Sequence, residues 1–255
     1  MISIAKAVGT GVASASIFAS GAPGFILRAS DAPLEVVPVD SDNLQEEYFR
    51  MRFDTYIGRK KYEGREAYPE GRMKDPYDEH SLWSLVRHIK TGVYLGAVRF
   101  VLRPEGKILP FEQFRTLPSV NGAVAEISSF LFCRGRIKDA QLPHTLNGGN
   151  RGFGLVSLFL MKACFEMGSR HEIEAVCGLL CPVLFGMFKK EGIEFKSVPD
   201  EKGNETVEYH GSRQPCWNTA SGLLKGIKAH NEDLYDLVRP RDEVYLKRLM
   251  GNISD

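Results

Sequence analysis

Apolar and polar residues alternate in several stretches of the chain, as they do in strands that bury one face. The stretches with this spacing or with a strand-like composition cover residues 34–39, 81–89, 93–102, 124–132 and 174–178. Lys90, Thr91 and Gly92, between the second and third stretches, are typical of a hairpin turn. Residues 193–198 and 206–210 indicate another hairpin across a turn-rich segment. The pattern therefore predicts a mostly antiparallel sheet.

Other stretches have the spacing of helices. Between residues 42 and 57 apolar positions recur at helical spacing, and Gly58 ends the pattern. Residues 155–167 are apolar on nearly every side, which is typical of a buried helix. Further helices are expected, in chain order, over residues 182–188, 223–227, 233–238 and 240–250.

Two polar segments interrupt these elements. Residues 59–78 form a long loop, and such loops in compact domains usually serve as lids or binding elements. Its last acids, Asp75 and Asp78, either turn toward one cation or stabilise a turn. Residues 147–154 are glycine-rich and open the buried helix, so they either bind an anion at the positive end of the helix dipole or connect flexibly. Their spacing matches neither a Walker loop nor a dinucleotide-binding fingerprint.

The length and composition fit one folded domain. Of the 255 residues, 43% are hydrophobic and 25% are charged, and no repeat or linker divides them. We expect a single domain over residues 33–255 with a helical appendage at its C-terminal end. Residues 1–32 are expected to form a flexible or amphipathic arm that packs on the domain or touches a membrane surface. Their apolar run is too broken by glycine to span a bilayer and is weak for a cleaved signal peptide.

Charge and cysteine content narrow the class of function. The net charge of +1 gives no overall field that would favour nucleic acid as a partner. Cys177 and Cys181 lack the companion ligands of a zinc site, so we expect no metal, and reduced thiols favour the cytoplasm. Arg134, Arg136 and Lys138 form either a docking patch for an acidic protein or a solvated surface.

Two opposite charges stand at positions that otherwise look buried. Strand alternation places Glu126 on the face of Val124 and Phe130 and turns Cys133 to the other face. Arg99 lies in the same way on an apolar face of the preceding strand. Because an ionised group is costly to bury alone, these positions predict either a structural ion pair or a cleft with a chemical function.

The order of elements resembles the GNAT-type N-acyltransferase fold, a mixed α/β fold with a central, mostly antiparallel sheet flanked by helices. The combination of charged and aromatic residues resembles the core of the acyl-homoserine-lactone synthases, whose charged cluster lies in the active-site cleft. The residues that carry this resemblance are Arg52, Tyr56, Asp75, Asp78, Gly96, Arg99, Phe111 and Glu126. One position departs from that family: its glutamate is followed by a Ser-Arg pair, where this chain has Ser128 and Ser129. The departure weakens the expectation of S-adenosylmethionine as the amine substrate.

The C-terminal half is similar to the exosortase-associated acyltransferases and the related N-acyl amino acid synthases. This resemblance rests on Pro110, residues 125–128, Gly192, Ile193, residues 208–213 and Pro215. It covers residues 35–217 and implies transfer of a long acyl chain from acyl carrier protein to the amine of an amino acid. The Tyr209-His210-Gly211 segment with Arg213 is its most distinctive part and has no assigned role.

Together the resemblances and the chemistry of thioester aminolysis give each residue an expected role. Glu126 is the expected base, acting directly or through water. The expected substrate-binding residues are Arg52, Asp75, Asp78, Arg99 and Ser128. The expected acyl-donor-binding residues are Arg134, Arg136, Arg151, Gly152 and Gly154. His210 and Arg213 are further site candidates.

We expect no cofactor apart from the acyl donor, which is acyl carrier protein or coenzyme A carrying the chain. Two other functions remain open: an autoinducer synthase of the acyl-homoserine-lactone type, and a non-catalytic acyl-binding protein of the same fold.

Overall fold

The computed structural model describes residues 16–18, 26–28, 32–60, 62–103, 108–140 and 154–251. Arg151 and Gly152, two of the expected donor-binding residues, lie outside these ranges with most of the glycine-rich segment. Of the expected N-terminal arm, the structure describes Ala32 and two short strands, β1 (Ser16–Phe18) and β2 (Ile26–Arg28), which pair antiparallel.

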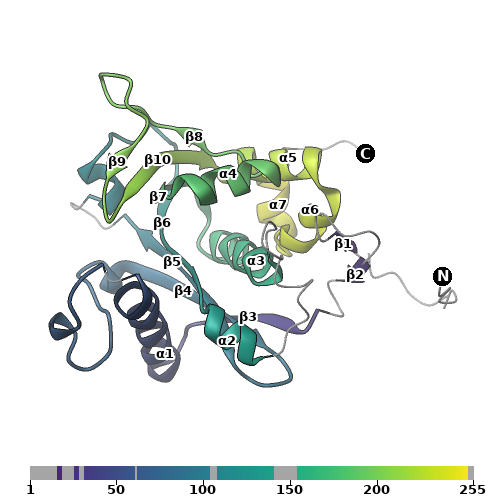
Figure 1. Cartoon of the computed structure of the whole chain (residues 1–255). Coiled ribbons are helices and arrows are strands. Elements are labelled where there is room, and N and C mark those ends of the chain that lie inside the picture. The colour runs from purple at the N-terminus through teal and green to yellow at the C-terminus, as the bar shows by residue number, and fades with distance from the viewer. Residues whose placement is uncertain are drawn as a thin grey trace, which may run out of the picture.

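A sheet of eight strands forms the centre of the fold (Figure 1). Its strands are β3 Leu34–Pro38, β4 Ser81–His88, β5 Tyr94–Leu102, β6 Ala123–Phe132, β7 Ile173–Leu180, β8 Lys196–Ser197, β9 Val207–Glu208 and β10 Ser212–Thr219. The order across the sheet is β3-β4-β5-β6-β7-β10-β8, and β9 also pairs with β10. Every pair is antiparallel except β6 with β7, which run parallel. The predicted mostly antiparallel sheet is therefore confirmed.

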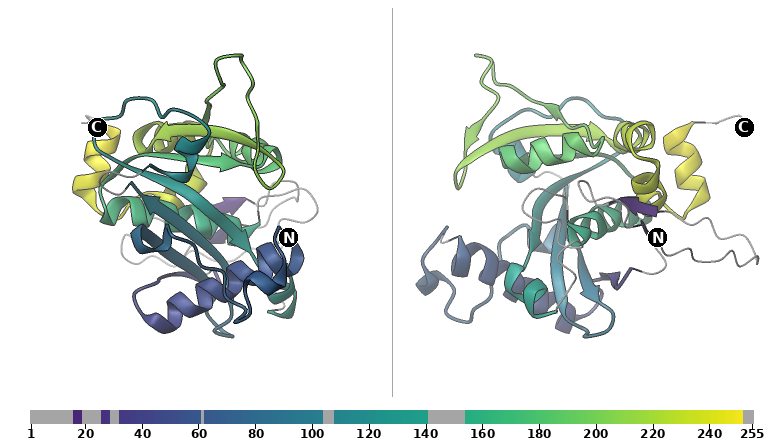
Figure 2. Two further views of the ribbon diagram at one scale, coloured as in Figure 1. Left: turned by 90° about the vertical axis from the view of Figure 1, so that its left-hand side faces the viewer. Right: turned by 45° about the vertical axis from the view of Figure 1, so that its right-hand side comes forward.

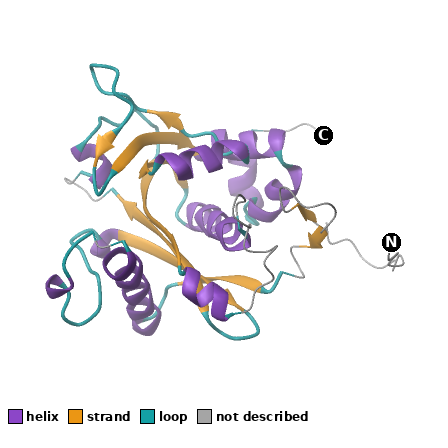
Figure 3. Cartoon of the chain, in the orientation of Figure 1, coloured by secondary structure: helices purple, strands orange, loops and turns teal. Residues whose placement is uncertain are grey.

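Helices lie on both sides of the sheet (Figure 3). They are α1 Asp42–Phe53, α2 Arg134–Asp139, α3 Leu155–Arg170, α4 Pro182–Lys190, α5 Ala220–His230, α6 Glu232–Val238 and α7 Glu243–Met250. A π-helical turn over Asp54–Arg59 continues α1, so the predicted helix over residues 42–57 is confirmed. Figure 2 shows α5, α6 and α7 gathered at the end of the molecule away from α1.

Successive side chains of β4 and β5 point to opposite faces of the sheet, so the core has two layers. Leu85 and Ala97 pack against Met51 beneath α1, whereas Val86 and Val98 belong to the larger cluster built around α3. That larger cluster also contains apolar residues of α5, α6 and α7. Burying one Leu, Val or Met side chain fully stabilises the fold by about 1.5–3 kcal/mol. The two layers therefore hold α1 and α3 on opposite faces of the sheet.

A β-bulge interrupts the pairing of β5 with β6. Arg99 lies opposite Ser129, but the next residue, Phe100, lies opposite Ile127, so Ser128 is an extra residue in β6. The extra residue inverts the alternation of every side chain that follows it in the strand. Ser128 itself is turned toward Arg99, whose Nε donates to the Ser128 hydroxyl oxygen at 2.6 Å.

The bulge corrects the predicted faces of β6. Leu131 and Cys133 contact the core beneath α1, on the face to which Glu126 points, and Phe130 and Phe132 contact the core around α3. The predictions that Phe130 shares the face of Glu126 and that Cys133 lies on the opposite face were therefore wrong. Strict alternation fails because one inserted residue shifts the period by one position.

The predicted hairpin between residues 193–198 and 206–210 was also wrong in its pairing. β8 and β9 each pair with β10 and not with each other. The sequence pattern missed β10 because its residues, from Ser212 to Thr219, are largely polar and include Pro215. β10 is nevertheless held between β7 and the short strands, and its register places Arg213 opposite Val207.

Candidate active site

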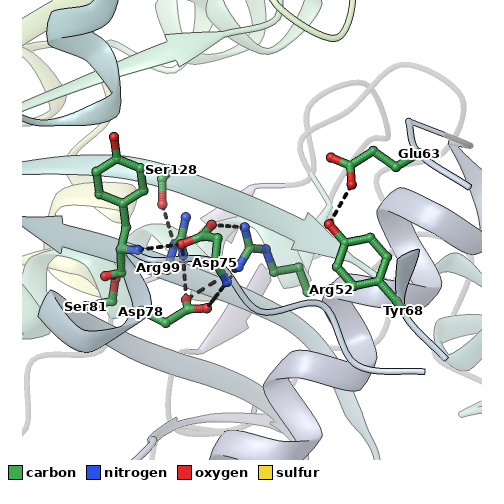
Figure 4. Close-up of polar contacts among 9 residues, drawn as sticks. Arg52, Glu63, Tyr68, Asp75, Asp78, Ser81, Arg99 and Ser128 are labelled. Atoms are coloured by element: carbon green, nitrogen blue, oxygen red, sulfur yellow. Dashed lines mark hydrogen bonds and ion pairs between the residues drawn. The ribbon is translucent and has the colours of Figure 1, made fainter. Parts of the chain in front are cut away.

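Four charged side chains from three segments form a compact cluster on the α1 face of the sheet (Figure 4). Arg52 comes from the last turn of α1, Arg99 from β5, and Asp75 and Asp78 from the long polar loop. Arg99 Nη1 lies 3.0 Å from Asp75 Oδ1 and 2.5 Å from Asp78 Oδ1. Arg52 pairs with Asp75 through Nη2, and its Nη1 lies 3.4 Å from Asp78 Oδ1. The two aspartates therefore bridge two arginines.

The same aspartates also shape the loop that carries them. The backbone N–H of Asp75 donates to Asp78 Oδ2 at 2.7 Å, and that of Tyr77 donates to Asp75 Oδ1 at 2.9 Å. Both alternatives left open by the sequence, a turn and a shared cation, are thus realised. The acids share two cations in place of one, because Arg52 and Arg99 each bind both acids.

The cluster is buried, and its opposite charges balance one another. Arg52 and Arg99 are 5% and 3% exposed. Burial by itself would raise the pKa of Asp75, but the guanidinium groups of Arg99 and Arg52 lower it to about 2. Two cations and two anions leave the cluster with no net charge. Arg52 and Arg99 are therefore engaged in holding the polar loop against the sheet.

Glu126 lies beside this cluster but outside its ion pairs. Its side chain is 2% exposed, and Oε2 accepts a hydrogen bond of 2.7 Å from the backbone N–H of Phe111. Burial raises the pKa of Glu126 to about 7, although the Phe111 N–H and the Arg99 guanidinium act in the opposite direction. A carboxyl group with this pKa can accept and release a proton near neutral pH.

The parallel strands β6 and β7 part next to Glu126. Their residue pairs run from Ala123 with Ile173 to Glu126 with Cys177, and the remaining residues of β6 have no partner in β7. Gly178 follows Cys177 in β7, and the Cβ of any other residue at this position would lie 3.1 Å from the carbonyl oxygen of Ile127. Glu126 thus stands at the last residue pair between the two parallel strands.

The expected donor-binding residues of α2 are only partly available. Arg136 Nη1 pairs with Glu47 and also donates to the carbonyl oxygen of Tyr94 at 3.4 Å. Arg134 and Lys138 remain exposed. Gly154 is described at the N-terminus of α3, where it precedes the first helical residue.

The remaining candidates lie on the hairpin formed by β9 and β10, His210 in its turn and Arg213 in β10. The ring of His210 stacks on Tyr62 with centroids 4.9 Å apart, and Arg213 Nη2 donates to the Tyr62 hydroxyl at 2.9 Å. Tyr62, which contacts both candidates, was missed by the sequence pattern because it lies among the charged residues of the polar loop. Its spacing from Tyr56, on which its ring stacks, was the available signal.

The described part of the chain contains neither a candidate metal site nor a candidate membrane-spanning helix. No group of three or more His, Cys, Asp or Glu side chains there could hold a metal ion. No helix among the described residues has the length and apolar character needed to cross a bilayer.

The fold is similar to that of several solved structures. The coenzyme A-dependent acyl-homoserine lactone synthase BjaI, solved with MTA, is 16% identical, has a TM-score of 0.57, and matches over 85% of this chain and 98% of its own. TofI, solved in a ternary complex with an inhibitor and MTA, is 15% identical with a TM-score of 0.55, over 77% of this chain and 97% of its own. FeeM, an N-acyl amino acid synthase from uncultured soil microbes, is 11% identical with a TM-score of 0.50, over 77% and 97%.

Comparison of the sequence with known protein families identifies no family for this chain. No protein-family model matches the chain, and no curated protein matches it either. At identities of 11–16% the structural likeness shows a shared fold. The fold that the sequence predicted by resemblance is thereby confirmed.

Proposed function

We propose that this protein, whose fold is shared with acyl-homoserine lactone synthases and an N-acyl amino acid synthase, is an N-acyltransferase. The proposed reaction moves a long-chain fatty acyl group from acyl carrier protein or coenzyme A to the amino group of an amino acid. The observation that carries the proposal is the buried Glu126, with a pKa of about 7, at the point where β6 and β7 part.

The proposed mechanism is direct aminolysis of the thioester. An ammonium group is not nucleophilic, so the Glu126 carboxylate takes a proton from it, directly or through water. The neutral nitrogen then forms a bond to the thioester carbon, and the tetrahedral intermediate collapses with cleavage of the carbon–sulfur bond. The protonated Glu126 returns its proton to the leaving thiolate, and the nitrogen, which is positively charged after the attack, loses its second proton to solvent. The products are the amide and the free thiol, and no covalent enzyme intermediate is required.

The parting strands support a binding place for the thioester arm. Backbone N–H and C=O groups on an unpaired strand edge can bond an extended, amide-containing chain as they would bond another strand. The N–H groups near Glu126 are also suited to stabilise the oxyanion of the tetrahedral intermediate. Gly178 lets the backbones of β6 and β7 stay close to one another at the point where their pairing ends. For a carrier protein, the exposed residues Arg134 and Lys138 offer positive charge.

The Arg–Asp cluster is proposed to position the catalytic strand. Arg99 holds Ser128 at the bulge, two residues from Glu126, and its bonds to Asp75 and Asp78 attach the polar loop to the same place. With both arginines already paired, the cluster supplies a rigid wall of the site. We therefore assign Arg52, Asp75 and Asp78 as positioning residues.

The apolar interior offers a route for the acyl chain. A cavity of about 20 Å³ lies between the sheet and the C-terminal helices. It is lined by side chains that include Ile127, Met161, Cys164 and Phe195. The cavity is too small to hold a long acyl chain, so binding such a chain requires these side chains to move apart.

The acceptor distinguishes this proposal from a lactone synthase. Ser129 takes the place of the arginine expected from the resemblance to the lactone synthases and is 2% exposed. A short buried hydroxyl cannot replace a guanidinium in binding a charged substrate. This supports a different amine and favours an amino acid over S-adenosylmethionine.

The test measures thiol release from acyl carrier protein and from acyl-coenzyme A with a panel of amino acids and with S-adenosylmethionine. We expect turnover with an amino acid, and a loss of about 100-fold or more in kcat for Glu126→Gln, the scale of general base catalysis. Glu166→Gln, a charge-neutralising change in α3 at a residue paired with Arg170, is the matched control and should keep its turnover.

Unchanged turnover in Glu126→Gln would overturn the mechanism. A lactone product formed only with S-adenosylmethionine would support the autoinducer synthase. Acyl-chain binding without any thiol release would support the non-catalytic alternative.

A further inference from the structure

The hairpin between β9 and β10 carries a strained backbone that the proposed mechanism does not use. His210 has φ +51° and Gly211 has φ +93°. The left-handed region is open to glycine but unfavourable for most other residues, and non-glycine residues held there are concentrated at functional sites. This geometry turns the ring of His210 back toward the polar loop, where it meets Tyr62.

Stacked rings fix the hairpin against two distant segments. Tyr62 stacks on Tyr56 at 5.5 Å and on His210 at 4.9 Å, with interplanar angles of 18° and 14°. On the other side of the hairpin, the ring of Tyr209 lies 5.3 Å from that of Phe114. The hairpin is therefore braced from the end of α1 and from the segment that follows Phe111.

Arg213 is held by this brace without a negative partner. Its Nη2 donates to the Tyr62 hydroxyl at 2.9 Å and to the carbonyl oxygen of His210 at 2.7 Å, and its Nη1 donates to the carbonyl oxygen of Ser212 at 3.0 Å. All of these acceptors are neutral. Within the described residues no carboxylate forms an ion pair with Arg213, in contrast to Arg52 and Arg99. The guanidinium is positioned, partly exposed and uncompensated in charge.

The hairpin also lies close to the catalytic face. The ring of Tyr209 packs on Phe114, whose backbone N–H donates to the carbonyl oxygen of Phe111 at 3.0 Å, and the Phe111 N–H donates to Glu126 Oε2 at 2.7 Å. Phe114 and Phe111 therefore link Tyr209 to the carboxyl group of Glu126. Arg213 lies four residues farther along the same hairpin, at its braced side.

We propose that Arg213, oriented by Tyr62, binds the carboxylate of the acceptor amino acid; this inference rests on the proposed function. The three hydrogen bonds leave the Nε–H and one Nη1–H of the guanidinium for a carboxylate oxygen, and a charge-assisted bond of this kind is stronger than a neutral one. The carboxylate would be anchored at the hairpin while the amine reaches toward Glu126. The ligand class is therefore an α-amino acid and not a simple amine.

The test compares one accepted amino acid with its carboxamide, which keeps the amine and side chain but has no negative charge. We expect the wild-type enzyme to prefer the acid. In Arg213→Gln the KM of the acid should rise about 10-fold to 100-fold, while the KM of the carboxamide and of the acyl donor stay unchanged. Arg213→Lys should restore part of the preference.

A matched control distinguishes binding of the acceptor carboxylate from structural support of a loop. Arg115 also holds a loop through carbonyl oxygens, those of Val198 and Asn204, and Arg115→Gln should alter acid and carboxamide equally if it alters either. Equal losses for both acceptors in Arg213→Gln would reduce Arg213 to a structural role and overturn the inference. A raised KM for the donor alone would assign the anion to the phosphate of the donor arm and also overturn it. Absence of any acyl transfer by the wild-type enzyme would instead overturn the proposed function on which the inference rests.

Discussion

Arg99 and Glu126 point to the same face of the sheet from neighbouring strands, yet they do not form an ion pair. The Arg99 guanidinium is bonded to Asp75, Asp78 and Ser128, and Glu126 takes its hydrogen bond from the Phe111 N–H. Glu126 is consequently buried near a cation that is already neutralised by other acids. This arrangement keeps the pKa of Glu126 at about 7, where a direct ion pair would have lowered it.

The first prediction concerns the pH dependence of activity. The base must be ionised to accept the ammonium proton, so kcat/KM should rise about tenfold per pH unit below 7 and bend near the pKa of Glu126, about 7. Steady-state rates of thiol release from pH 5 to 9 measure this profile. In Glu126→Gln the bend should disappear from the residual activity. A bend that persists in this variant would assign it to another group.

The second prediction concerns stability. Glu126 has a folded pKa of about 7, raised from 4.5, so its contribution to stability is fully present below 4.5 and is lost as the pH rises through 7. Glu126→Gln removes the buried charge and should gain on the order of 3 kcal/mol relative to wild type at high pH. Urea unfolding of both proteins at pH 5 and pH 9 gives the difference. A gain of equal size at both pH values would contradict the prediction.

The third prediction concerns the Arg–Asp cluster. Asp78→Asn leaves buried cationic charge without full compensation, which typically costs about 3–5 kcal/mol in the free energy of unfolding. Glu35→Gln breaks an ion pair with Arg87 in which both side chains are well exposed, and should cost less than about 1 kcal/mol. Denaturant unfolding compares the two variants. Similar small costs would mean that the cluster does not hold the polar loop.

The fourth prediction concerns Cys133, which the bulge turns toward the face of Glu126. Its Sγ lies 3.9 Å from the Thr55 hydroxyl oxygen. Burial raises the pKa of the Cys133 thiol, and the thiolate is the nucleophilic form, so we expect Cys133 to take no covalent part in the reaction.

Cys133→Ala should therefore retain turnover, and mass spectrometry of the wild-type enzyme mixed with acyl donor alone should detect no acyl-enzyme. Loss of turnover together with an acylated Cys133 in the wild type would require a two-step mechanism.

Local pattern was sufficient for most of the elements. The hairpin of β4 and β5, the helix α1 and the buried helix α3 follow from short-range periodicity, which each segment carries in its own residues. The bulge at Ser128 and the strand β10 do not, because both depend on how a partner strand is aligned. An inserted residue is visible only against the strand that opposes it.

For the candidate site, the residues alone were enough to identify the charged groups and, through resemblance, to assign them to one cluster. Which charges pair depends on how the chain folds. Arg99 and Glu126 lie on adjacent strands, yet the loop folds back so that Asp75 and Asp78 pair with Arg99. Likewise, Tyr62 and Arg213 meet across 151 positions of the chain. Such contacts depend on the packing of distant segments, whereas sequence periodicity reports only which side of its own element a residue occupies.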